Sequence, residues 1–548
     1  MQIKKYLLII ILLLAAGLRL WKLGSIPPGL TPDEASLGYN AYSILKTGKD
    51  EYGKFLPLIF KSFGDYKPGL YVYLIVPLVA LFGLNEFAVR LPSALAGIVT
   101  VYLIYLIVQL LFANNHKLSV IAAFVAATNP WLIYFSRGAW EVNVSLTLTL
   151  AGIYFFLKSL QRPKFLTFSF LLFALSLLTY QGAKLATSIV LVLLLVCFWK
   201  EVVKIQKKYL IWSILVGLAV SSPIILSLFT GKTGRLDVFS VFSYPRPKEY
   251  LEAQLAQGAE RVGSLSYYLF HSESLNFKRE ILGRYFNHFS GRFLFFEGDW
   301  SNLRHSAPYQ GVLLLSDLVT LLFGLLVIFR TKFNKGHLFV ILWLALAPLP
   351  AVLSRDQVHA VRSFNLVVPL IIILAFGLNE MIKWLDGRMV KWAFLVFYFL
   401  AFSYFMDAYF VHVPNHNSQL WGYGYKQIVE TVTPIQKNYN VIKVQQSFAQ
   451  PYIYFLFFQK YDPAKYQRQI SWVESEYKGD VGYVTKLDNI EFAPIDWSVN
   501  RGEHGTLFVA DTIRIPPEDS KDGELFKVIK EIKYLNNRDM AFRIIEVK

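Results

Sequence analysis

Two adjacent carboxylates, Asp33 and Glu34, follow the proline-rich residues 27–32 (PPGLTP). Such a pair can act as a general base, because a rigid turn aims it into a cavity and partial desolvation moves a carboxyl pKa towards neutrality. A structural interpretation is also open: Thr31 or Asp33 would cap a helix whose N-terminus favours acidic residues. The two interpretations are compatible, since a helix start is a rigid support for a base.

Two further places combine acidic and basic side chains. Lys67 follows Asp65 and Tyr66 just before an apolar stretch. A lysine in this position either snorkels to a membrane interface or binds a lipid phosphate. Arg137 and Glu141 are four residues apart, a spacing that gives an ion pair on a helix or brings two functional charges together. Both interpretations stay open for each place.

Cationic and imidazole side chains recur late in the apolar part of the chain. Arg355, His359 and Arg362 have three- and four-residue spacing, so one helical face would present all three. Arginine offers a fixed fork of donors that binds phosphate oxygens, and this segment therefore suits a phosphate. Arg304 and His305 precede a later apolar run and are candidates for substrate binding, with an ordinary loop as the alternative.

The elements that must position these residues are apolar helices. The chain has 548 residues, of which 55% are hydrophobic and 17% charged, and its mean hydropathy is +0.41. This composition is typical of an integral membrane protein. About eleven runs are long enough to cross a hydrocarbon core of about 30 Å: 5–23, 91–113, 118–135, 143–160, 165–180, 185–199, 209–229, 311–330, 336–353, 364–383 and 391–411.

Two apolar stretches need a separate interpretation. The stretch 70–84 is short for a full crossing, and we expect it to be interfacial or re-entrant. The first run follows Lys4 and Lys5 and is also similar to a secretory signal. Arg19, Trp21 and Lys22 at its end are instead typical of an interfacial anchor, so we expect it to remain as a span.

Basic residues predict the orientation of these spans. If the N-terminus is cytoplasmic and 70–84 does not cross, lysine and arginine collect in the inside loops, as the positive-inside rule requires. These residues are Lys117, Arg162, Lys164, Lys200, Lys204, Lys207, Lys208, Arg330, Lys332, Lys335, Lys383, Arg388 and Lys391. The net charge of +17 thus follows from topology and not from nucleic-acid binding. All the candidate residues named above then lie outside.

Residues 412–548 differ in character from residues 1–411. They are polar, and short β-rich runs such as 441–444 and 506–510 alternate with helical stretches. We expect a small extracytoplasmic α/β domain after a transmembrane domain that contains a first outer loop, 24–90, and a long outer insertion, 230–310. The single cysteine, Cys197, lies in an apolar run, which excludes an internal disulfide and a thiolate metal cluster.

Four short motifs occur together in this chain: residues 19–21 (RLW), 31–34 (TPDE), 67–68 (KP) and 86–95 (EFAVRLPSAL). Together they resemble the GT-C glycosyltransferases, nearest to their protein O-mannosyltransferase and aminoarabinose transferase branch, the family 39/83 type. The resemblance is specific over about residues 10–145 and weaker through 298–365. It implies a polytopic α-helical fold of the GT-C type and an inverting transfer of a sugar from a polyprenyl-phosphate donor to an acceptor outside the membrane.

The resemblance also implies a role for each matching residue. Asp33 would be the base, Glu34 would support it or the acceptor, Lys67 would contact the donor phosphate, and Glu141 would be a second acid. Relatives often have an aspartate at this second position and a second proline where this chain has Gly69. The remaining predicted phosphate ligands are Arg137, Arg355, His359 and Arg362, and the remaining predicted substrate contacts are Asp65, Tyr66, Arg304 and His305.

Two other classes of protein are alternatives to an enzyme. A transporter or flippase of lipid-linked sugars usually has ionisable residues near the membrane midplane and repeated halves, whereas the charges here fall in predicted outer loops and no repeat is visible. A sensor or scaffold would leave the clustered acids and arginines unexplained. We therefore predict a glycosyltransferase of the cell membrane. Its partners would be a polyprenyl-phosphate sugar, a protein, glycan or lipid acceptor and membrane lipids, but no nucleic acid; no cofactor is predicted, and a divalent metal is an unsupported alternative.

Overall fold

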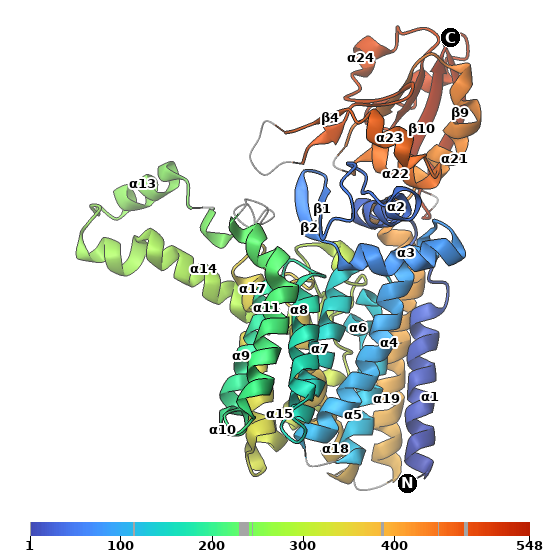
Figure 1. The fold of residues 1–548 in the computed structure, drawn as a ribbon. Helices are drawn as coiled ribbons and strands as arrows, with labels where there is room; N and C mark the ends of the chain where they lie inside the picture. The colour runs from blue at the N-terminus through green and yellow to red at the C-terminus, as the bar shows by residue number, and fades with distance from the viewer. Residues whose placement is uncertain are drawn as a thin grey trace.

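The computed structural model describes residues 2–548 except 113–114, 230–239, 244, 385–387, 448, 476–480 and 537, so part of the predicted insertion 230–310 lies outside the described residues. Long helices stand side by side, and a region of mixed helices and strands lies beyond one end of them (Figure 1). The N-terminus lies at the other end. The candidate residues therefore sit where the helical layer meets the C-terminal region.

Each predicted span overlaps one long helix. These helices are α1 Gln2–Leu20, α4 Glu86–Leu111, α5 His116–Thr128, α7 Glu141–Ser159, α8 Phe165–Leu177, α9 Ala183–Cys197, α11 Lys207–Phe229, α15 Asp317–Arg330, α16 Lys335–Leu346, α18 Val367–Trp384 and α19 Arg388–Asp407. Among the described residues, six helical stretches are long and apolar enough to cross a membrane by length and composition, and other apolar helices are shorter. The number of spans stays a prediction.

The predicted run 118–135 contains two helices, α5 and α6 (Pro130–Phe135). Asn129 lies between them, and its side chain accepts a hydrogen bond from the backbone N–H of Leu132 at 3.0 Å. A capping asparagine followed by proline starts a new helix, because proline has no N–H to donate to the preceding turn. Similarly, α17 (Leu349–Val352) follows α16 after Pro348.

Close packing holds the layer together. α7 and α18 are largely buried, whereas α11 and α19 expose most of their apolar side chains, as expected for helices in contact with lipid. α15 and α18 approach each other at two glycines: a Cβ atom at Gly377 would lie 1.9 Å from the Thr320 carbonyl oxygen, and one at Gly324 would lie 2.1 Å from that of Ile373. Small residues at such crossings let helix backbones come into contact.

The segment predicted to form the first outer loop, here named the first outer segment, lies across the ends of the long helices. It contains α2 (Pro32–Thr47), a hairpin of antiparallel strands β1 (Ile59–Ser62) and β2 (Asp65–Pro68), and α3 (Leu70–Phe82) (Figure 1). α3 has 13 residues and lies across the bundle instead of running along it, and its interfacial position stays a prediction. This segment supplies one side of the candidate site.

The predicted outer insertion contains a projecting arm. Its helices α13 (Lys248–Gln257) and α14 (Glu273–Asn287) extend sideways from the bundle (Figure 1). Within the arm, η2 Tyr267–His271 lies between these two helices, and the short turns η3 Arg292–Phe296 and η4 Leu303–His305 connect α14 to α15. The last of these turns brings the chain back to the candidate site.

The C-terminal region is built on a six-stranded sheet with strand order β6-β7-β3-β8-β10-β9. β3 lies inside the sheet between β7 and β8 and is parallel to both. The strands nearer the edges are antiparallel to their neighbours, as β10 is to β8. The strands are β3 Ile442–Gln445, β6 Lys486–Leu487, β7 Ile490–Ala493, β8 Leu507–Ala510, β9 Phe526–Lys533 and β10 Met540–Val547, with a separate pair β4 Trp472–Val473 and β5 Tyr483–Val484. β3 and β8 overlap the predicted β-rich runs.

Helices α20 Val413–His416, α21 Tyr425–Ile435, α22 Pro451–Phe458, α23 Pro463–Arg468 and α24 Trp497–Asn500 also belong to the C-terminal region. Of these helices, α22 and α23 contact α2 of the first outer segment. α22 packs on α2, where a Cβ atom at Gly38 would lie 2.5 Å from the Phe457 ring. The Tyr454 hydroxyl donates a hydrogen bond to the Leu30 carbonyl at 3.0 Å. The C-terminal region therefore rests directly on the loop that carries the acidic pair.

Candidate functional site

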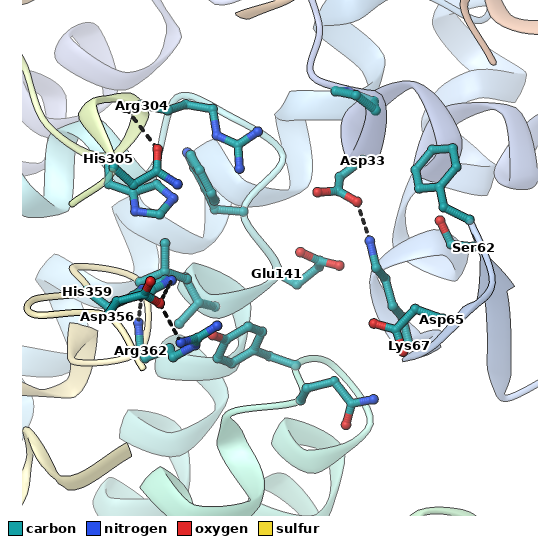
Figure 2. Close-up of a pocket in the computed structure, with 18 of the residues that line it drawn as sticks. Asp33, Ser62, Asp65, Lys67, Glu141, Arg304, His305, Asp356, His359 and Arg362 are labelled. Carbon is teal, nitrogen blue, oxygen red and sulfur yellow. Dashed lines mark hydrogen bonds and ion pairs between the residues drawn. The ribbon is translucent and has the colours of Figure 1, made fainter. Parts of the chain in front are cut away.

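A cavity of about 610 Å³ lies between the first outer segment and the loops above the bundle. Asp33 and Lys67 lie on one side of it, the residues of 304–305 and 356–362 lie on the other, and Glu141 lies between them (Figure 2). Gln450 and Val481 of the C-terminal region complete the lining. The cavity thus joins segments that are more than 400 residues apart in the sequence.

Asp33, at the start of α2, forms an ion pair with Lys67 on strand β2 of the hairpin (Figure 2). Burial raises the pKa of Asp33, but the charge and the hydrogen bond of Lys67 outweigh it and bring that pKa below its usual value. For Lys67, burial lowers the pKa, and Asp33 and Glu141 outweigh burial, so this pKa is raised. Both groups are therefore charged near neutral pH.

Glu34 has a different environment from its neighbour. Its side chain is 5% exposed and accepts a hydrogen bond from Arg90 Nε at 2.9 Å. It also accepts one from the Ala139 backbone N–H at 2.9 Å and one from the Thr31 backbone N–H at 3.0 Å. The Thr31 hydroxyl in turn accepts from the Glu34 backbone N–H at 3.2 Å, which completes a capping box at the start of α2.

These contacts hold Glu34 away from the main cavity, in a small pocket beside it. They join α2 to α4 and to the residues before α7. The structural interpretation of the acidic pair thus holds for Glu34 and Thr31, while Asp33 faces the cavity. A buried carboxylate with several donors fixes the position of its neighbour, and Glu34 therefore orients Asp33 through the backbone of α2.

Glu141 is the first residue of α7 and lies between the two walls of the cavity (Figure 2). No ion pair of its side chain is found within the described part of the chain. Its charge nevertheless contributes to the raised pKa of Lys67. Glu141 is thus a second carboxylate within reach of whatever binds beside Lys67.

The opposite wall is organised around Asp356. Its carboxylate lies 2.9 Å from Arg362 Nη1, 3.9 Å from Arg355 Nε and 4.0 Å from His359 Nε2. Arg304 also lines the cavity, and it lies over the Trp140 ring, with 5.9 Å from the guanidinium carbon to the ring centroid. One acid among three arginines leaves an excess of positive charge on this wall, which suits an anion.

The predicted helical face for Arg355, His359 and Arg362 is wrong. Residues 353–363 form a loop of turns between α17 and the short helix η5 (Phe364–Leu366). Partners elsewhere in the fold replace the hydrogen bonds of a helix: the His359 backbone N–H donates to His288 Nε2 at 3.2 Å, and that of Ala360 donates to Asp299 Oδ2 at 2.8 Å. The loop still directs the three side chains to the same cavity.

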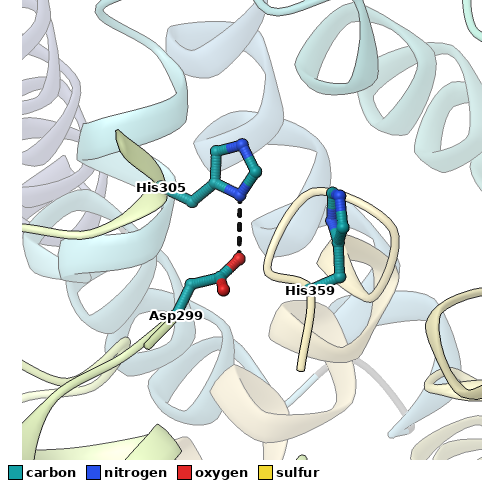
Figure 3. A group of neighbouring side chains, drawn as sticks. All are labelled: Asp299, His305 and His359. Carbon is teal, nitrogen blue, oxygen red and sulfur yellow. Dashed lines mark hydrogen bonds and ion pairs between the residues drawn. The ribbon is translucent and has the colours of Figure 1, made fainter. Parts of the chain in front are cut away.

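Asp299, His305 and His359 form a compact group beside this wall (Figure 3). Asp299 is fully buried and accepts a hydrogen bond from His305 Nδ1 at 2.8 Å. Burial lowers the pKa of both histidines, and the nearby Arg362 lowers it further. The ligand atoms of the three residues lie within 4.8 Å of one another, as a metal site requires, but the Asp299 oxygens already accept protein N–H groups and arginines add positive charge nearby.

Arg137 lies outside the lining of the cavity, contrary to its predicted role. It is fully buried, and it donates to the carbonyl oxygens of Leu18 at 2.8 Å, Trp21 at 2.7 Å and Ile26 at 3.2 Å. It thus satisfies carbonyl groups at the end of α1, as basic residues commonly do at helix ends. It forms no i,i+4 pair with Glu141, because residues 136–140 between α6 and α7 are not helical.

The predicted substrate residues are divided between the cavity and its supports. Asp65, Arg304 and His305 line the cavity. Tyr66 contributes a backbone carbonyl, which accepts a hydrogen bond from Gln181 Nε2 at 2.5 Å. Gln181 itself lines the cavity, so Tyr66 connects β2 to the α8–α9 loop.

Sequence reasoning missed several residues of the site. Asp299 and Asp356 had a detectable signal, since each is an acid within six residues of a candidate histidine or arginine. Tyr180 and Gln181 had only a weak signal, a polar pair between two apolar runs. Gln450 had none, because only the docking of the C-terminal region brings it to the cavity. Its backbone φ of 54° is unusual for a residue other than glycine.

Comparison with known proteins gives two kinds of match. Residues 66–226 match a family described as dolichyl-phosphate-mannose-protein mannosyltransferase. No curated protein sequence matches the chain significantly. Among solved structures, ArnT from Cupriavidus metallidurans in the apo state is similar with a TM-score of 0.54 at 12% identity, over 98% of this chain and 97% of ArnT.

A second structure of the same ArnT, bound to undecaprenyl phosphate, gives a TM-score of 0.54 at 11% identity over 99% of this chain and 97% of ArnT. An oligosaccharyltransferase from Archaeoglobus fulgidus is less similar, with a TM-score of 0.47 at 14% identity over 82% of this chain and 61% of the other. The ArnT matches show a shared fold over nearly the whole length of both chains. With the matched segment, they confirm the resemblance to GT-C glycosyltransferases of the mannosyltransferase and ArnT type.

Proposed function

We propose that this chain is a glycosyltransferase that moves a sugar from a polyprenyl-phosphate donor to an acceptor on the outer face of the cell membrane, with inversion at C1. One observation carries the proposal: an acid and an excess of arginine line opposite sides of one cavity at the end of a helical bundle. The match to ArnT bound to undecaprenyl phosphate supports a lipid-phosphate donor. The positive-inside pattern supports a cytoplasmic N-terminus.

In the proposed reaction, Asp33 removes the proton of the acceptor hydroxyl as its oxygen forms a bond to C1 of the sugar. The bond between C1 and the phosphate oxygen breaks, and its electron pair leaves with the polyprenyl phosphate. Arg355 and Arg362 stabilise the charge that develops there, and Arg362 needs little reorganisation because Asp356 already holds it at 2.9 Å. Attack from the side opposite the phosphate accounts for inversion.

Lys67 has two possible partners in this scheme. In the structure it binds Asp33, which stabilises the charged carboxylate and makes it a weak base. A donor phosphate that reaches the hairpin competes for the Lys67 ammonium. As the lysine turns to the phosphate, the pKa of Asp33 rises towards that of a useful base. The donor therefore activates the residue that accepts the proton.

Glu141 supports the same step from between the walls. Its carboxylate lies near both Asp33 and Lys67, so it keeps Lys67 protonated when Asp33 is neutralised by the transferred proton. We propose that it also contacts the acceptor, since it faces the space between the base and the arginines. Replacement by glutamine tests this role through a loss in kcat.

The decisive experiment compares cells that lack this chain with cells that carry it or its Asp33→Asn variant. We expect the wild-type chain alone to restore a glycan, glycolipid or glycoprotein, and the donor lipid to accumulate in the other two strains. Mass spectrometry of lipids and glycans identifies donor and acceptor together. If the lipid and glycan profiles are the same in all three strains, the proposed function is wrong.

A further inference from the structure

Asp299 accepts several hydrogen bonds from protein groups, and its proposed role does not include contact with the donor phosphate. One oxygen, Oδ2, accepts from His305 Nδ1 at 2.8 Å and from the Ala360 backbone N–H at 2.8 Å. The other, Oδ1, accepts from the Asn302 backbone N–H at 3.0 Å. Asp299 is fully buried and absent from the lining of the cavity, whereas His305 and His359 both line it. The aspartate therefore acts on the cavity through the histidines.

These hydrogen bonds define the proton positions on the two imidazole rings. His305 Nδ1 faces a carboxylate, so it carries the hydrogen, and Nε2 of the neutral ring is left with a lone pair. His359 Nδ1 accepts a hydrogen bond from the Arg362 backbone N–H at 3.2 Å, so the hydrogen of this ring lies on Nε2. Burial lowers the pKa of each ring, which favours the neutral form of both.

The cavity wall thus presents a hydrogen-bond acceptor beside a donor, on rings whose centroids are 4.9 Å apart. A phosphate offers only acceptors at its oxygens when fully ionised, and the His305 lone pair would repel them. A hydroxyl group both donates and accepts, so it satisfies such a pair. The sugar of a phosphate-linked donor lies next to the phosphate, and the histidines lie next to Arg304 and Arg362.

We infer that His305 and His359 bind hydroxyl groups of the transferred sugar, and that Asp299 is the positioning residue that keeps the His305 lone pair directed to them. This inference rests on the proposed function and deepens it, since it separates the sugar subsite from the phosphate subsite. It moves His359 from the predicted phosphate ligands to the sugar. It also gives the fully buried Asp299 a purpose beyond packing.

The test measures binding to the full-length protein in lipid nanodiscs. The probes are a short-chain polyprenyl phosphate without a sugar, and a panel of the same lipid bearing mannose, other hexoses or pentoses. We expect at least one sugar-bearing probe to bind the wild type about tenfold more tightly than the bare phosphate, as one or two hydrogen bonds allow. His305→Ala abolishes this difference and leaves binding of the bare phosphate within about twofold.

The Asp299→Asn variant distinguishes positioning from general support of the fold. An asparagine has one oxygen and one NH2 in place of the two carboxylate oxygens that accept from His305 Nδ1, Ala360 and Asn302, so it cannot satisfy all three donors, and the negative charge that holds the hydrogen on His305 Nδ1 is lost. We expect loss of the sugar preference and a matching change in the ¹⁵N chemical shifts of His305, while the bare phosphate binds as before. Arg362→Ala is the matched control, since it weakens both probes alike.

Each other outcome overturns the inference. It is wrong if no sugar-bearing probe binds more tightly than the bare phosphate, if His305→Ala weakens both probes equally, or if Asp299→Asn leaves the His305 tautomer and the preference unchanged. If the preference requires a divalent cation and is lost with a chelator, the three residues hold a metal instead. If the wild type binds no probe at all, the proposed function fails first, which separates the two results.

Discussion

The two walls of the cavity hold their charges in different ways. On the hairpin wall, Asp33 and Lys67 form a single ion pair between side chains that are 46% and 23% exposed. On the loop wall, Asp356 contacts two arginines and a histidine, and buried Asp299 ties the same loop to the turn before α15. The first wall can exchange partners when a substrate arrives, whereas the second is preorganised.

The largest effect is expected from a substitution on the hairpin wall. Asp33→Asn removes the proposed base and should lower kcat by about 10²- to 10⁴-fold, the usual contribution of general base catalysis. Binding of the donor lipid should change little, and turnover of the purified enzyme in nanodiscs measures both. Glu518→Gln, an exposed substitution in the C-terminal region, is the control for the loss of one carboxylate. Full activity of the Asp33 variant would refute the assignment of the base.

The neighbouring substitution should act on stability instead. Glu34→Gln leaves Arg90 buried without its anionic partner, and the removal of one member of a buried pair typically costs about 3–5 kcal/mol. We expect a lower midpoint of thermal unfolding in detergent than for Asp33→Asn. The contrast fails if both variants unfold at the same temperature, and in that case the division of roles between the two acids is wrong.

A smaller effect is expected on the loop wall. Arg362→Ala should raise the Kd of the donor lipid about 10- to 100-fold, since hydrogen bonds to charged groups contribute about 1.5–3 kcal/mol. Arg330→Ala, at the other end of the bundle on α15, is the matched control and should bind the donor normally. An equal loss of acceptor binding in the Arg362 variant would contradict a site for the donor phosphate.

The smallest expected effect is a shift in the pH profile. The pKa of Asp33 is below its usual value because Lys67 stabilises the carboxylate, so the base form persists as the pH falls. Lys67→Met removes that cation, and the acidic limb of kcat/KM should move to higher pH. Lys61→Met on the same hairpin, where Lys61 pairs with Glu474, should leave the limb in place. A shift to lower pH would show that Lys67 does not stabilise the charged form of Asp33.

Much of the fold follows from the length of the apolar runs, because each predicted span overlaps at least one helix. The breaks inside runs follow from proline, as at Pro130. The relation between the C-terminal region and the loop before α2 could not be predicted. It depends on complementary surfaces, such as that between Gly38 and Phe457, which no local pattern encodes.

The site shows the same division. The candidates were charged residues in predicted outer loops, and most of them line the cavity, including Asp33, Lys67 and Glu141. Spacing did not predict which charges turn inward to support the backbone. Arg137 binds carbonyl groups of α1, and Glu34 binds Arg90, because an unpaired carbonyl group or charge in the interior is costly. A charge near a membrane is therefore a sign of use, but the use can be structural.

The contact between α22 and α2 joins the C-terminal region to the proposed active site. The C-terminal region supplies Gln450 to the cavity, and its Tyr454 binds the Leu30 carbonyl, three residues before the proposed base. An exchange of this region between related enzymes would change the wall of the active site as well as the outer surface. A chimeric protein that keeps activity would have to include residues 24–47 together with the C-terminal region, because the surfaces of these two segments pack on each other.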